Sequence, residues 1–193
     1  MEKGNSYLVT KNIAQIGIFA TILVICAQII IPMPFGVPLT MQTFGILLAG
    51  IILGAKKGFI AVLVYLLLGA IGLPVFQGFS GGVAPFAGPT GGFLLSFPLM
   101  PIIVGFGMRM GRKVKNSISK HFLLVVVLFV AVFVNLFTGL LFFSINMSTN
   151  LTQAFQVTVL PFVFVEIIKI AGASILGTSV RAALLKGNII YEI

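Results

Sequence analysis

The chain alternates between long apolar runs and shorter segments that are polar or rich in glycine and proline. Six apolar runs can be distinguished, and they cover residues 13–31, 39–55, 58–75, 93–108, 122–143 and 157–180. A helix that crosses the ~30 Å hydrocarbon core of a membrane needs about 20 predominantly apolar residues, with a lower limit near 17. The pattern therefore predicts an all-α integral membrane protein with six transmembrane helices, which form a single domain over residues 1–193.

The basic residues between the apolar runs predict the orientation of the helices. They occur before the first run and after the second, fourth and sixth: Lys3 and Lys11, Lys56 and Lys57, Arg109, Arg112, Lys113, Lys115 and Lys120, and Arg181 and Lys186. The segments 32–41, 76–92 and 144–156 contain no Lys or Arg. Because basic loops stay on the cytoplasmic side, we expect a multi-pass protein of the cytoplasmic membrane with both termini inside.

Composition supports a membrane protein and excludes other classes. The chain is 59% hydrophobic and only 8% charged, whereas soluble domains carry roughly 25% charged residues. A formal charge of +9 would suggest nucleic acid in a soluble protein, but here the positive charges report orientation in a lipid bilayer, so no nucleic-acid partner is expected. The lone His121 follows the basic segment and is expected at the membrane interface, and no metal site is predicted.

One pair of charges lies inside an apolar run. Glu166 and Lys169 are three residues apart in the run 157–180, so they would share one face of a helix. Charges in hydrocarbon are costly and usually face the bundle interior or a wet cavity, where they are functional. Glu166 would lie roughly 13 Å into the helix from its outer end. We therefore expect an outward-facing ligand cavity, although a purely structural ion pair is the alternative.

Further polar residues and a glycine-rich loop could complete such a site. Ionised Glu166 only accepts hydrogen bonds and Lys169 only donates them, which suits a ligand with N–H donors and an oxygen acceptor. The other candidates are Thr40, Gln42, Thr43, Gln77, Ser80, Thr90 and Asn135. Each of these could instead bridge two helices. The outer segment 77–92 (QGFSGGVAPFAGPTGG) is too rich in glycine and proline for a long helix and is expected to act as a lid.

Other chemistry is poorly supported by the sequence. No Gly-Lys-Ser/Thr phosphate loop follows the glycines, so this chain cannot use ATP by itself. There is no Ser/His/Asp set or His/Cys cluster, and we do not expect an enzyme. A single acid and a single base in one helix do not form the rings of a channel. A self-sufficient proton-coupled carrier for a small polar solute, with Glu166 as the proton site, remains the alternative function.

The combination of motifs resembles a known family over roughly residues 13–180. The matching pieces are PMPFGVPLTMQTFGILLAGIILGAKKG (32–58), GLPVFQGFSGGVAPFAGPTGGFLLSFP (72–98) and PFVFVEIIKIAGA (161–173). Together they resemble BioY, the family of biotin-specific substrate-binding subunits of energy-coupling-factor (ECF) transporters. The resemblance implies a six-helix fold and high-affinity biotin binding and uptake across the cell membrane. Biotin would be the transported ligand, with no cofactor.

The resemblance also implies site residues and partners. The acid and lysine of the last helix and the glycine-rich loop would bind biotin, and the substrate-binding set becomes Glu166, Lys169, Gln42, Thr43, Gln77, Gly82, Gly91, Gly92, Phe93 and Asn135. The family acid is usually Asp, and Glu166 is one methylene longer. The partners implied are a transmembrane coupling protein and two ATPase subunits, which alone use ATP. We expect the coupling protein to contact small residues of the first helix, namely Ala14, Gly17, Ala20 and Thr21.

Overall fold

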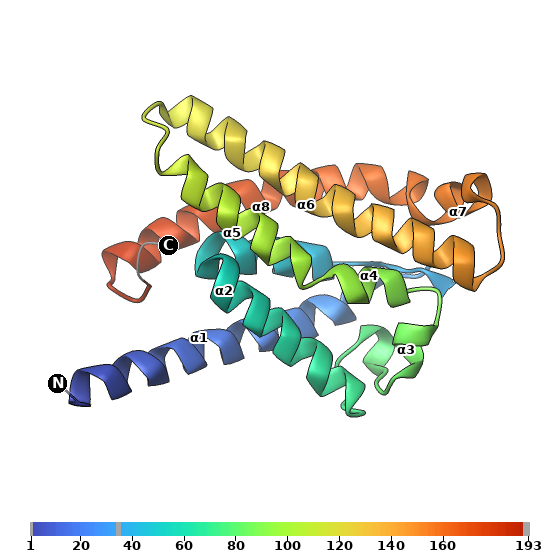
Figure 1. Cartoon of the computed structure of the whole chain (residues 1–193), viewed down its shortest axis with the longest axis horizontal. Helices are drawn as coiled ribbons and strands as arrows, with labels where there is room; N and C mark the ends of the chain where they lie inside the picture. The colour runs from blue at the N-terminus through green and yellow to red at the C-terminus, as the bar shows by residue number, and fades with distance from the viewer. Residues whose placement is uncertain (1, 34–35, 191–193) are drawn as a thin grey trace.

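The computed structural model describes residues 2–33 and 36–190, which are largely helical (Figure 1). The elements in chain order are α1 (Glu2–Gln28), β1 (Ile30–Ile31), β2 (Leu39–Thr40), α2 (Gln42–Ala70), the 3₁₀ helix η2 (Gln77–Phe79), α3 (Ala84–Ala87), α4 (Gly91–Ser96), α5 (Leu99–Gly111), α6 (Ser117–Asn146), α7 (Leu151–Thr158) and α8 (Leu160–Lys186). The predicted all-helical class is confirmed. The proline-rich connection also contains a small antiparallel hairpin, in which Ile30 pairs with Thr40; Pro34 lies outside the described residues.

Five helical stretches of the described chain are long and apolar enough to cross a membrane. They are Thr10–Gln28, Gln42–Ala70, Gly91–Gly111, Ser117–Asn146 and Leu160–Lys186. The runs 39–55 and 58–75, expected to be separate helices, lie mostly within α2, which is divided by non-helical backbone at Gly54 into two helical segments. Large apolar side chains such as Ile18, Phe133 and Phe164 point outward and are at least 60% exposed, as expected for a surface that faces lipid.

Helix α2 folds back on itself at Gly54. This residue has φ +79° and ψ −177°, a region of backbone space that is essentially open only to glycine. The side-chain Nε2 atom of Gln42 lies 2.7 Å from the hydroxyl oxygen of Tyr65. In a straight helix, residues 23 positions apart would be separated by roughly 34 Å. The segments 42–53 and 55–70 therefore run antiparallel, and Figure 1 shows the cyan and green-blue halves of α2 meeting at this turn.

Arg181 closes the turn of α2 from the neighbouring helix. Arg181 follows the last apolar run and is expected in a C-terminal tail, but it lies inside α8 and is only 8% exposed. Its Nη1 atom donates hydrogen bonds of 2.9 Å to the carbonyl oxygens of Ile51 and Ile52. Carbonyls at the end of a helix lack intrahelical partners, so a guanidinium here satisfies them and complements the helix dipole.

Another expected helix is interrupted near a proline, and a short helix forms in a segment that was expected to be a loop. The run 93–108 becomes α4 and α5, which are separated at Phe97 and Pro98. The polar segment 144–156, expected to be a loop, contains α7, whose first turn is capped because the Asn150 side chain accepts a 2.8 Å hydrogen bond from the amide of Gln153. The chain changes direction between α4 and α5, and α7 is a short helix at the end of the bundle where the β1–β2 hairpin also lies (Figure 1).

One end of the bundle is assembled from the irregular segments. The β1–β2 hairpin, α3 and α7 gather at the right of Figure 1, opposite the first turns of α1 and the end of α8. The Gln28 side chain joins α1 to the glycine-rich loop, because it donates to the Phe76 carbonyl at 3.0 Å and accepts from the Phe79 amide at 3.1 Å. Phe76 packs edge-on against both Tyr65 and Phe86. The loop is therefore anchored to the bundle along its length.

Candidate functional site

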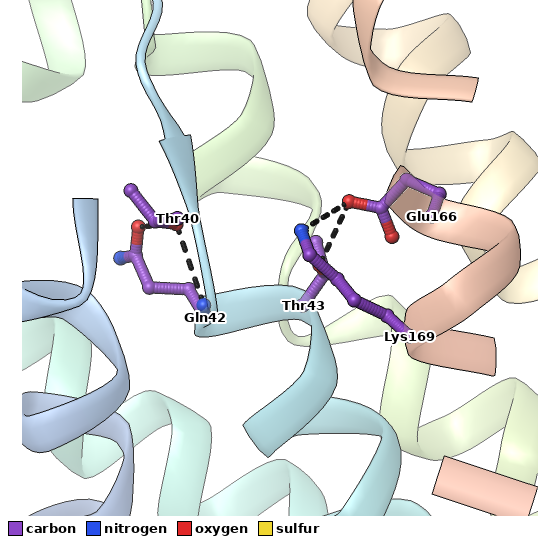
Figure 2. Close-up of polar contacts among 5 residues, drawn as sticks. All are labelled: Thr40, Gln42, Thr43, Glu166 and Lys169. Carbon is purple, nitrogen blue, oxygen red and sulfur yellow. Dashed lines mark hydrogen bonds and ion pairs between the residues drawn. The ribbon is translucent and has the colours of Figure 1, made fainter. Parts of the chain in front are cut away.

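The two charges predicted from the last helix meet a hydroxyl from α2. Lys169 Nζ donates to Glu166 Oε1 at 2.6 Å and to Thr43 Oγ1 at 3.0 Å. Thr43 Oγ1 in turn donates to Glu166 Oε1 at 2.9 Å (Figure 2). All three side chains are buried, with Glu166 3% and Lys169 4% exposed. The expectation that the pair shares one face of a helix and points into the bundle is confirmed by this geometry.

Glu166 keeps one oxygen free of this network. Its Oε2 atom is buried and makes no hydrogen bond to any residue that the structure describes. Figure 2 shows Oε2 pointing away from Lys169 and Thr43. A buried acceptor without a donor costs free energy of about 1–3 kcal/mol, and more when it is charged. Oε2 is therefore the atom best prepared to accept an N–H donor from a ligand.

The start of α2 positions a second polar group beside this triad. Gln42 is 2% exposed, and its Oε1 accepts a 2.7 Å hydrogen bond from Thr40 Oγ1. Its Nε2 donates to the hydroxyl of Tyr65. Tyr65 comes from the returning half of α2, so the fold-back at Gly54 fixes the orientation of the Gln42 amide. Tyr65 lies within an apolar run of the sequence, where no local pattern indicates this contact.

These residues surround a cavity of about 40 Å³. Seven of the ten predicted substrate-binding residues line it: Glu166, Lys169, Gln42, Thr43, Gln77, Phe93 and Asn135. The remaining walls come from Val37, Pro38, Thr40, Thr90, Leu94, Phe97, Leu136 and Phe162. The rings of Phe93 and Phe162 stack with centroids 6.2 Å apart. The cavity thus combines a donor, an acceptor and flat apolar walls, which is the composition of a small-molecule site.

The three predicted glycines do not line the cavity. A Cβ atom on Gly91 would lie 2.0 Å from the Phe86 carbonyl, and one on Gly92 would lie 2.4 Å from Phe142 Cβ. These glycines therefore permit the loop and α4 to pack closely, the first against Phe86 and the second against α6. Gly82 has φ +86° and donates its amide to the Gly69 carbonyl at 2.7 Å. The structure assigns all three a role in shaping the loop.

Asn135 both lines the cavity and joins two helices. Its Nδ2 atom donates to the Phe93 carbonyl at 3.0 Å and to Ser96 Oγ at 2.7 Å. Asn135 is 1% exposed, so these bonds satisfy an amide that would otherwise be costly to bury. Asn135 therefore makes the helix–helix contact that the sequence analysis kept as the alternative to ligand binding. Ser96, its partner, was not among the candidate residues.

The small residues of α1 divide between two faces. Ala14, Gly17 and Thr21 are exposed, and a Cβ built on Gly17 meets nothing within 4 Å. Ala20 is only 4% exposed and belongs to the hydrophobic core. The prediction that Ala20 lies on the same exposed face as the other three is wrong, because the two steps of three residues from Ala14 through Gly17 each fall short of a 3.6-residue turn and carry Ala20 round to the core side of the helix.

Comparison with known proteins identifies the class. A model of the BioY family matches residues 1–186. A probable biotin transporter BioY of Pyrococcus horikoshii is 38% identical over 92% of this chain and 98% of its own length. A biotin transporter BioY of Thermotoga maritima is 34% identical over 89% of this chain and 96% of its own length. The crystal structure of the S-component for biotin from an ECF-type ABC transporter superposes with a TM-score of 0.80, at 28% identity, over 91% of this chain and 93% of that one.

The fold and site define a membrane transport protein with a small-molecule cavity. The chain belongs to the BioY family. The family resemblance predicted from the sequence is confirmed. The expectation of a transport protein in place of an enzyme is likewise confirmed, because the family and its relatives are transporters.

Proposed function

We propose that this chain is a biotin-binding S subunit of an ECF-type transporter in the cell membrane, and that it captures biotin in the Glu166 cavity. The observation that carries the proposal is the buried Glu166 carboxylate, which has one oxygen held by Lys169 and Thr43 and the other unpartnered. Membership of the BioY family and the likeness to the S-component for biotin support it.

The chemistry of biotin suits the groups around this cavity. The ureido ring offers two N–H donors and one carbonyl, so one N–H can bind Glu166 Oε2. Lys169 can donate to an oxygen of the ligand, since an ammonium group has three N–H donors and two are used here. The fused rings and aliphatic tail would lie along Phe93 and Phe162. This assignment leaves Thr43 as the residue that holds Oε1 in place.

Binding requires the cavity to expand. Its volume of about 40 Å³ is far below the roughly 300 Å³ of ordinary ligand pockets. Gln77 and Thr90 lie at the two ends of the glycine-rich loop and both line the cavity. We propose that the loop 77–92 is a lid whose displacement admits biotin. Displacement of the loop would break the hydrogen bond that the Phe79 amide donates to Gln28 Oε1.

We further propose six membrane crossings with both ends of the chain cytoplasmic. The fold-back at Gly54 supports this count, because the chain reverses direction there and the two parts of α2 would belong to two different crossings. Lys57 Nζ donates to Gln15 Oε1 at 2.6 Å, and Lys11 donates to the Asn188 carbonyl, so basic residues of α1 and α2 meet the C-terminal segment at one end of the bundle. By the positive-inside rule this end is cytoplasmic, and the Glu166 cavity opens to the opposite side.

Energy coupling would come from partner subunits. We propose that the exposed residues Ala14, Gly17 and Thr21 of α1 form the contact face for a transmembrane coupling protein, which joins two ATPases. Among the described residues, no other part of the fold lies within 4 Å of a Cβ on Gly17, which supports this face, because small residues let membrane helices approach closely.

Titration calorimetry of the purified chain tests the proposed ligand. Biotin should bind with saturation, and thiamine and riboflavin should not. Intrinsic fluorescence is a poor substitute, because the chain has no Trp. The absence of heat with biotin, from folded protein free of co-purified biotin, would contradict the proposal. Uptake that persists in ATP-depleted vesicles and collapses with the proton gradient would favour the proton-coupled carrier, in which Glu166 Oε2 is the proton site.

A further inference from the structure

A second cavity lies between α5, α6 and α8, away from the Glu166 site. Its volume is about 300 Å³. From α6 the cavity is lined by Lys120, which is roughly 22 Å along the helix from Asn135. From α8 the cavity is lined by Thr178, which is roughly 18 Å along the helix from Glu166. The two cavities are therefore at opposite ends of the same helices, and the second has no part in the biotin proposal.

The mouth of this second cavity is cationic. Ser117, Lys120 and His121 line it from the first turns of α6, and their spacing places them on one helical face. All three are exposed. The Lys120 Cγ atom lies 3.7 Å from the position of a Cβ on Gly111, so the lysine stem crosses α5 at a residue without a side chain. None of the residues that line the cavity is acidic.

The deeper part of the cavity is apolar. Met108 and Leu124 line it, together with Gly107 and Gly111 of α5. Leu124 is 5% exposed and belongs to the hydrophobic core. A ligand that fills this cavity must therefore place an anionic group at the mouth and an apolar group against α5 and α6.

Basic residues close by in the sequence make the electrostatic potential at the mouth of the cavity more positive. Arg109, Lys113 and Lys115 precede Lys120 within twelve residues, directly after a membrane-spanning stretch. Basic residues at the membrane surface attract anionic lipids, each by about fivefold in affinity. A basic pocket between membrane helices is the arrangement that binds phospholipid headgroups.

We propose that this cavity binds the phosphodiester headgroup of an anionic membrane phospholipid. The phosphate would lie between Lys120 and His121, where Ser117 can donate a further hydrogen bond. The glycerol and the start of one acyl chain would lie along Met108 and Leu124. The shared chemistry is a phosphate ester, but a soluble phosphate ester has no apolar group for the floor of the cavity, so a lipid is favoured.

Native mass spectrometry with titrated lipid tests the proposal on the full chain. The probes are phosphatidylglycerol, phosphatidylcholine and the soluble headgroup sn-glycerol 3-phosphate. Lys120→Gln removes a charge from the mouth, and Lys186→Gln removes the same charge from an exposed residue at the end of α8. Gly111→Leu fills the cavity without changing its charge. Gel filtration and biotin binding report whether each variant is folded.

The expected result is a preference for phosphatidylglycerol that falls about fivefold in Lys120→Gln, falls in Gly111→Leu, and is retained in Lys186→Gln. Equal binding of the two lipids, or equal losses in the two lysine variants, would overturn the proposal. Equal affinity for sn-glycerol 3-phosphate and phosphatidylglycerol would assign the cavity to a soluble phosphate ester and overturn the lipid assignment. If Gly111→Leu does not fold, the comparison of the two lysine variants decides the outcome.

Discussion

Thr43 and Glu166 are 123 residues apart in sequence and are joined by a buried hydrogen bond of 2.9 Å between Oγ1 and Oε1. Because Lys169 binds the same Oε1 atom, Oε2 has no hydrogen-bond partner among the described residues. The contact also ties α2 to α8 at the cavity. It makes Thr43 the residue that orients the carboxylate, while Lys169 balances its charge.

Replacing Thr43 by Val therefore tests the orientation of the carboxylate. Val has nearly the same shape but can neither donate to Glu166 nor accept from Lys169. Hydrogen bonds to charged groups contribute about 1.5–3 kcal/mol, so we expect biotin to bind roughly tenfold or more weakly. Calorimetric titration provides the measurement. Thr43→Ser keeps the hydroxyl and should retain most of the affinity, and equal affinities in Thr43→Val and the wild type would remove Thr43 from the site.

Removing Lys169 should destabilise the protein more than removing both charges. Lys169→Met leaves Glu166 buried without a cation, which typically costs about 3–5 kcal/mol. The double variant Glu166→Gln with Lys169→Met has no uncompensated charge and should recover part of that loss. Thermal unfolding in detergent, without biotin, measures both variants. If the effects of the two substitutions simply add, the ion pair does not stabilise the fold as described.

Substitution of Arg181 should affect stability through the turn of α2. Arg181→Met leaves the Ile51 and Ile52 carbonyls without the donors that the guanidinium supplies. A buried acceptor left unsatisfied costs about 1–3 kcal/mol, and we expect a clear fall in Tm. Arg181→Lys keeps a donor and the charge, so it should fall between the wild type and Arg181→Met. An unchanged Tm in Arg181→Met would show that the turn does not depend on this contact.

The turn itself can be tested at Gly54. Gly54→Ala places a Cβ on a residue with φ +79° and ψ −177°, and such strain costs of order 1–3 kcal/mol. The matched control is Gly17→Ala, because Gly17 lies in the interior of α1 with open space around it. That control should be neutral or slightly stabilising, since Ala favours a helix over Gly. Equal Tm changes in the two variants would argue against the strained turn.

A bulky residue at position 17 tests the proposed partner face. Gly17→Leu should leave the Tm and biotin affinity of the isolated chain unchanged, because the site is open. It should reduce co-purification with the coupling protein, since close helix approach requires a small residue. Ala182 is an exposed residue of α8, so Ala182→Leu is the control for a bulky side chain added elsewhere on the surface. Equal recovery of the complex with both variants would place the coupling protein elsewhere.

Much of the site follows from the sequence, because charges in an apolar run are few and costly to bury. The spacing of Glu166 and Lys169 predicts their shared face, and the structure adds that Thr43 joins them. The polar start of α2 likewise identifies Gln42. In contrast, Tyr65 and Ser96 appear in the sequence as ordinary members of apolar runs. Their hydrogen bonds depend on where other helices pack, which local patterns do not contain.

The fold, like the site, could be predicted only in part from local sequence patterns, because other features depend on how the helices pack. The apolar runs predict the helices, but not that two of them form one folded-back helix at Gly54, because a single glycine in a run does not reveal its φ. Arg181 follows the last strongly apolar residues, so its position suggested a cytoplasmic tail. Only the packing of α8 against α2 shows that it binds the carbonyls of Ile51 and Ile52.

The most direct test of the central claim is the biotin affinity of Glu166→Gln measured by calorimetry against the wild type. An amide has one acceptor oxygen, so it cannot serve Lys169 and Thr43 and also accept an N–H from the ligand. The loss of a hydrogen bond to a charged group predicts binding weaker by roughly tenfold or more. Unchanged affinity, in protein shown to be folded, would contradict the proposal that Glu166 Oε2 receives the ligand.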